Sequence, residues 1–65
     1  MSARLYVEAP VNPGATSADA AQYLMAELDR RAAEVNRTIN GPVTIYEGHD
    51  AFQKIVRVEA DTKPR

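Results

Sequence analysis

The chain has one histidine, His49, and it stands directly before Asp50. A histidine oriented by a carboxylate can move a proton near neutral pH, so this pair is the first candidate for catalysis. No Ser, Cys or second His lies near it in the sequence to complete a nucleophilic mechanism. One histidine with scattered carboxylates also lacks the spacing of a metal-ligand set. We therefore expect no catalytic residue, no metal site and no enzymatic activity.

A second candidate is the segment from Asn12 to Ser17, which leads from an expected strand into an expected helix. Backbone N–H groups at the start of a helix can bind an anion such as a phosphate. This segment lacks the glycine spacing and the lysine of phosphate-binding loops, and Asp19 would repel an anion. We expect no cofactor to bind here.

The first half of the chain predicts a strand followed by a helix. Apolar and polar residues alternate over about residues 3–9, which is the period of a half-buried strand, and Pro10 ends the pattern. Thr16 or Ser17 can cap the first turn of a helix that we expect over about residues 17–39. Its apolar stripe recurs at steps of three and four residues and comprises Ala21, Leu24, Met25, Leu28, Ala32, Val35 and Ile39.

The second half predicts two further strands. Asn40-Gly41-Pro42 ends the helix, because Gly accepts a left-handed backbone and Pro cannot continue the hydrogen-bond ladder. Strands follow at about 43–47 and 52–60, joined by turn residues at 48–50. The polar segment 61–65 is expected to be a frayed tail.

The order strand, helix, strand, strand indicates an α+β fold in a single small domain over residues 1–65, with one helix packed on a three-stranded sheet. If the last strand pairs with both others, the sheet is antiparallel in the order 1-3-2. A right-handed crossover that makes the first two strands parallel neighbours is the alternative. In either case a single helix covers only one face of the sheet.

Composition narrows the possible partners. The net charge is -1, so no excess of positive charge favours nucleic acid. No apolar run has the length of a signal peptide or a membrane span, which favours a cytoplasmic protein without membrane contact.

With 65 residues and no cysteine, the chain buries only about 60% of its unfolded surface and has no disulfide to support it. Self-association is therefore expected.

The uncovered sheet face is the expected contact surface, and its candidate partner-binding residues are Tyr6, Tyr46, Ile55 and Arg57. Tyrosine offers a large contact area with a polar end, which suits protein interfaces. We expect a small non-enzymatic protein-interaction module that forms a homo-oligomer or docks on another protein. One form of such an interaction module is an accessory protein of a virus or mobile element. The alternative is a carrier of a small flavin-type or nucleotide-type ligand, whose pocket forms between these tyrosines on oligomerisation.

Overall fold

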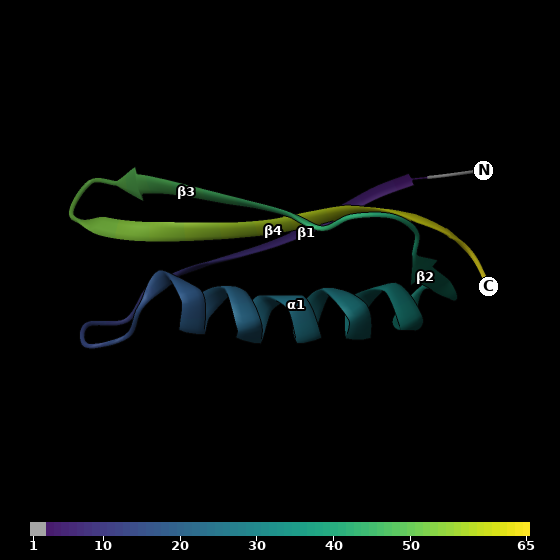
Figure 1. Cartoon of the computed structure of the whole chain (residues 1–65), viewed down its shortest axis with the longest axis horizontal. Helices are drawn as coiled ribbons and strands as arrows, with labels where there is room; N and C mark the ends of the chain where they lie inside the picture. Colours follow the sequence, from purple (N-terminus) through teal and green to yellow (C-terminus); the bar gives the residue numbers. More distant parts are fainter. Residues whose placement is uncertain (1–2) are drawn as a thin grey trace.

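The computed structural model describes residues 3–65, which form a sheet with one helix packed along it (Figure 1). The arrangement is elongated, with principal extents of 38 × 17 × 15 Å. In chain order its elements are β1 (Ala3–Pro10), α1 (Ser17–Glu34), β2 (Arg37–Ile39), β3 (Thr44–Asp50) and β4 (Gln53–Pro64).

The strand β4 lies at the centre of the sheet. It pairs antiparallel with β1 along one side, from Pro10↔Ile55 to Ala3↔Thr62. On its other side it pairs antiparallel first with β3 and then, near its end, with β2. The expected α+β fold, with one helix on an antiparallel sheet, is confirmed. The three-stranded order 1-3-2 is corrected, because the sheet has four strands in the order β1-β4-β2, with β3 also on β4.

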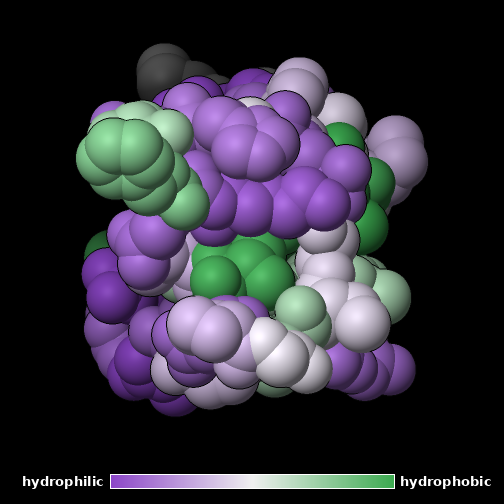
Figure 2. Space-filling model, turned by 90° about the vertical axis from the view of Figure 1, so that its left-hand side faces the viewer, coloured by the Kyte–Doolittle hydropathy of each residue, from purple (hydrophilic) through white to green (hydrophobic). Residues whose placement is uncertain are grey.

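The core lies between α1 and the sheet face that it covers. Cross-strand neighbours such as Val7 and Val58 contribute from the sheet, and Leu24 and Leu28 contribute from the helix. At the hairpin end, apolar surface is visible between the two layers (Figure 2). The buried apolar side chains are Val7, Ala21, Leu24, Leu28, Ala32, Val56, Val58 and Ala60.

The start of α1 is held by a capping box built on Thr16, one of the two caps that the sequence offers. The Oγ1 of Thr16 accepts a hydrogen bond from the backbone N–H of Asp19 at 3.1 Å, and the Asp19 carboxylate accepts one from the backbone N–H of Thr16 at 3.2 Å. Two N–H groups that lack helical partners are thereby satisfied.

The helix ends at Glu34 and not at residue 39, so the predicted end is wrong. Asn36 adopts a left-handed backbone with φ of 62°, a conformation that Asn tolerates and that terminates helices. Val35, which fitted the apolar stripe, is 57% exposed as a result. Residues Arg37–Ile39 form β2, and the β-branched Thr38 and Ile39 suit a strand.

The predicted tail is also wrong, because β4 continues to Pro64. Thr62 lies on the covered face of β4 and is fully buried. Its Oγ1 accepts a hydrogen bond from Nε of Arg37 and donates one to the carbonyl of Ala3, both at 2.7 Å. Strands on both sides therefore hold a segment that has no apolar pattern of its own.

The hairpin turn lies later than predicted. We expected a strand over 43–47 and a turn over 48–50, whereas β3 continues to Asp50 and the turn is formed by Ala51 and Phe52. Ala51 has φ of 55°, in the region that two-residue hairpin turns require. The pairing of Asp50 with Gln53 closes this tight turn.

Candidate functional site

The sheet face turned away from α1 is here called the outer face, and no helix within residues 3–65 lies over it (Figure 1). Strand residues alternate between faces, so the buried partners Val7 and Val58 place their sequence neighbours on the outer face. This face carries Arg4, Tyr6 and Glu8 from β1, Thr44, Tyr46 and Gly48 from β3, and Ile55, Arg57, Glu59 and Asp61 from β4.

The four residues selected from the sequence all lie on the outer face. Tyr46 pairs directly with Arg57, and Tyr6 lies on the opposite side of β4 at the neighbouring pair. Tyr6 is 55% exposed and Tyr46 is 47% exposed. Ile55 is partly buried one pair further along the strand, opposite Gly48. The structure therefore brings these side chains together from three strands.

Arg57 holds the centre of this group in a fixed position. Its guanidinium carbon lies 4.6 Å from the ring centroid of Tyr6, a cation–π contact. Its Nε donates a hydrogen bond to the Glu8 carboxylate at 3.2 Å. A positioned arginine beside an aromatic ring loses less conformational entropy when a partner binds.

Arg4 organises the other end of the outer face, and sequence reasoning did not select it as a contact residue. Its guanidinium donates to Glu59 at 2.6 Å, to Asp61 at 3.2 Å and to Oγ1 of Thr44 at 3.5 Å. The hydrogen bond to Glu59, followed by the one to Asp61, raises the pKa of Arg4 above its ordinary value. The guanidinium thus joins all three long strands through charged hydrogen bonds.

A shallow hollow lies beside Tyr46 because Gly48 has no side chain. An added Cβ at Gly48 would meet no atom within 4 Å, so the space above the strand is open. The hollow has a volume of about 250 Å³, and Ile55 and Arg57 are among its lining residues. A glycine within a strand can mark a place where another group approaches the backbone closely. Because a turn was expected at 48–50, the sequence did not identify Gly48 as such a strand residue.

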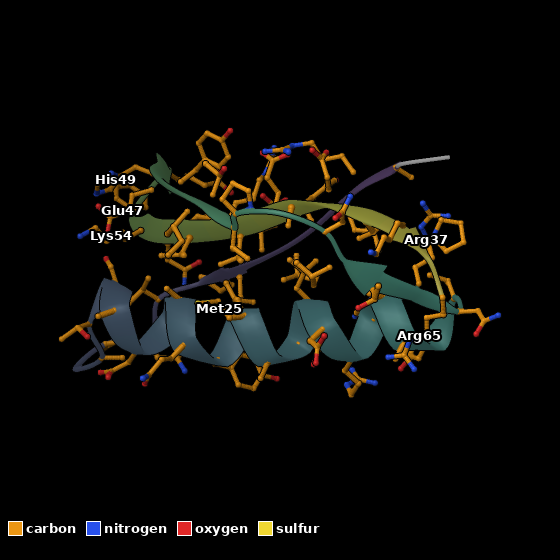
Figure 3. All side chains as sticks on the ribbon, turned by 45° about the vertical axis from the view of Figure 1, so that its right-hand side comes forward. Met25, Arg37, Glu47, His49, Lys54 and Arg65 are labelled. Carbon is orange, nitrogen blue, oxygen red and sulfur yellow. The ribbon has the colours of Figure 1, made fainter. Side chains whose placement is uncertain are left out.

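The side chains of His49 and Asp50 do not point to the same face of the sheet. Both belong to β3, where consecutive side chains point to opposite faces. Figure 3 shows His49 near Glu47 and Lys54 at the hairpin end of the molecule. Within residues 3–65, no group of three or more His, Cys, Asp or Glu side chains is placed to hold a metal ion.

Two further findings bear on the class of protein. In the part of the chain that the structure describes, no helix combines the length and apolar character needed to cross a membrane. Comparison with models of known families, with curated proteins and with solved structures yields no match.

Proposed function

We propose that this chain is a small non-enzymatic protein-interaction module that associates through its outer face, with a second copy or with another protein. The observation that carries this proposal is the outer face itself. No helix or strand of the described chain covers it, and two half-exposed tyrosines lie beside an arginine that is already positioned. Aromatic residues and arginine are the types that dominate protein contacts. The cytoplasmic location expected from the sequence belongs to the same proposal.

The hollow beside Gly48 supports a protein partner more than a small ligand. Its volume of about 250 Å³ is below the ~300–1,000 Å³ of typical small-molecule sites. It is open to solvent and lies next to Tyr46 and Ile55, so it suits one inserted side chain of a protein. Within one chain the hollow thus favours a protein partner, whereas a flavin-type or nucleotide-type carrier would need a larger pocket built between copies.

Two neighbouring residues of β3 offer a matched test. Tyr46 lies on the outer face and is 47% exposed, whereas Ile45 points to the opposite face and is 49% exposed. Each Glu substitution places the same charge in the same strand at similar exposure. We expect Tyr46→Glu to weaken association through the outer face by at least about tenfold, and Ile45→Glu to leave it unchanged.

The measurement is light scattering after size exclusion over a concentration series, with circular dichroism to confirm folding. Self-association through the outer face predicts a smaller mass for Tyr46→Glu than for the wild type. Loss of association in Ile45→Glu alone would move the interface to the other face and contradict the proposal. Equal masses for all three proteins would exclude self-association through this face, which leaves a different protein as its partner.

A further inference from the structure

The strand β1 forms one edge of the sheet. In the described part of the chain it pairs with β4 and with no other strand. An edge strand presents unpaired N–H and C=O groups that can bind another strand. Pro10 ends β1 without interrupting its pairing with β4. The edge is therefore long, regular and available for hydrogen bonding.

One hydrogen bond shows which groups of β1 point to this edge. The N–H of Val11 donates to the carbonyl of Lys54 at 2.8 Å, in register with the β1–β4 pairs. Along an antiparallel strand the N–H and C=O groups of alternate residues face opposite sides. The odd-numbered residues of β1 thus face β4, and Arg4, Tyr6 and Glu8 direct their backbone groups to the free edge.

We propose that β1 pairs antiparallel with β1 of a second copy of this chain, about a two-fold axis at Tyr6. In this register Tyr6 lies opposite Tyr6 of the second copy, and Arg4 lies opposite its Glu8. These are the residues whose backbone groups face the edge, so each such pair exchanges two N–H···O bonds. On the covered face, Leu5 lies opposite Val7 of the second copy.

Charge favours this register over those shifted by four residues. On the outer face Glu8 already contacts Arg57, and Arg4 already contacts Asp61. The two-fold at Tyr6 therefore continues a row of alternating charge across both copies: Arg57, Glu8, then Arg4 and Asp61 of the second copy. Opposite charges directly across a strand pair are stabilising and like charges are not. A shift of four residues sets Glu8 against Glu8 or Arg4 against Arg4.

The groove between β1 and α1 adds contact area beside the backbone bonds. It has a volume of about 410 Å³, and Tyr23, Glu27 and Arg31 line its helix side. A strand added to β1 enters directly alongside this groove, so the same two-fold brings the helices of both copies toward each other. Tyr23, which is 67% exposed, becomes covered there.

This interface is formed by the backbone edge of β1 and does not depend on the proposed function, although Tyr6 belongs to both surfaces. Pairing at β1 leaves the outer face open and joins two copies of it into one larger surface. The Tyr46→Glu variant is therefore expected to remain a dimer through β1. Loss of one interface leaves the other measurable.

Cysteine cross-linking tests the register directly, because the chain contains no cysteine. Opposed residues in a hydrogen-bonded antiparallel pair have Cα atoms about 5.5 Å apart, within the span of a disulfide. We expect Tyr6→Cys to oxidise to a covalent dimer of twice 7.1 kDa, at least about tenfold faster than Ile45→Cys, which lies on β3, away from β1 and from the outer face.

Two further variants separate this register from any other. Arg4→Cys alone and Glu8→Cys alone are each expected to form no covalent dimer on oxidation, whereas an equimolar mixture of the two is expected to form the mixed disulfide-linked dimer. A Glu8→Cys protein that cross-links to itself would overturn the register. Equal rates for Tyr6→Cys and Ile45→Cys would overturn the pairing at β1.

Proline substitution tests the interface without a disulfide. Glu8→Pro removes an N–H that points to the free edge of β1. Glu47→Pro is the matched control. The carbonyl of Asp61 accepts a hydrogen bond from the N–H of Asn40, so the odd-numbered residues of β4 direct their backbone groups toward β2 and β3. Tyr46 pairs with the odd-numbered Arg57 and faces β4, so the backbone groups of its neighbour Glu47 face the free edge of β3. In the Tyr46→Glu background, which removes association through the outer face, light scattering should show a monomer for Glu8→Pro and a dimer for Glu47→Pro. The opposite result contradicts the inference, and if Glu8→Pro does not fold, the cysteine variants decide it.

Discussion

The two faces of β4 differ in what their residues do. Val56 and Val58 are fully buried against the helix, whereas Ile55 and Arg57, each one position away, lie on the outer face. The covered face holds the fold together through apolar contact. The outer face is held by charged hydrogen bonds that stay in contact with water, which contribute little to stability. Substitutions on the two faces should therefore separate stability from association.

The largest effect on stability is expected in the core. Val58→Ala removes two buried methyl groups and should lower the free energy of unfolding by roughly 2 kcal/mol. Arg57→Ala, at the adjacent position, loses only exposed contacts with Glu8 and Tyr6 and should change it by less than about 1 kcal/mol. Urea unfolding of both variants measures the difference. Equal destabilisation would mean that the outer face also supports the fold.

The next largest effect on stability is expected at Thr62, because its hydroxyl is buried on the covered face and makes hydrogen bonds there. Thr62→Val keeps the shape but removes the hydroxyl that serves Arg37 and Ala3, leaving their polar groups without this partner. We expect a loss of about 1–2 kcal/mol by thermal or urea unfolding. Thr62→Ser is the control, since it retains the hydroxyl. If the Val variant is as stable as wild type, the hydroxyl does not hold β4 to its neighbours.

The smallest effect is expected on the exposed surface of α1. Hydrogen bonds from Arg30, and then from Arg31, lower the pKa of Glu27 below its ordinary value. Because the folded-state pKa lies below the unfolded one, the stabilisation is present above the ordinary Glu pKa of about 4.3 and is lost as pH falls through the lowered value.

Urea unfolding at pH 7 and pH 3 checks this for wild type and Glu27→Gln. The wild type should lose slightly more stability on acidification than the variant, because only the wild type carries this carboxylate. An identical loss in both proteins would show that the contacts of Glu27 with Arg30 and Arg31 do not contribute to folding.

Local patterns predicted the elements whose residues alternate or recur regularly. The alternation at 3–9 identified β1, and the position of Thr16 identified the start of α1. The end of α1 was missed because Val35 and Ile39 continue the helical spacing, although Asn36 adopts the left-handed conformation that stops it. A helical pattern alone does not show where the chain leaves the helix.

The candidate surface was predictable in its residues but not in its geometry. Alternation placed Tyr6, Tyr46 and Arg57 on one face, and the sheet confirms that placement. The contact of Arg57 with Tyr6 and the hollow at Gly48 depend on the register between strands. Register is a relation between distant segments, so no local pattern contains it.

By itself the sequence determined which side chains share a face, because strand and helix periods follow from backbone geometry. It also determined where α1 begins, through the side chains of Thr16 and Asp19. Only the tertiary structure decided that β4 is central and continues to Pro64. The reason is that residues 61–64 have no apolar pattern, and they become a strand because β1 pairs with residues 61 and 62 and β2 pairs with residues 62–64.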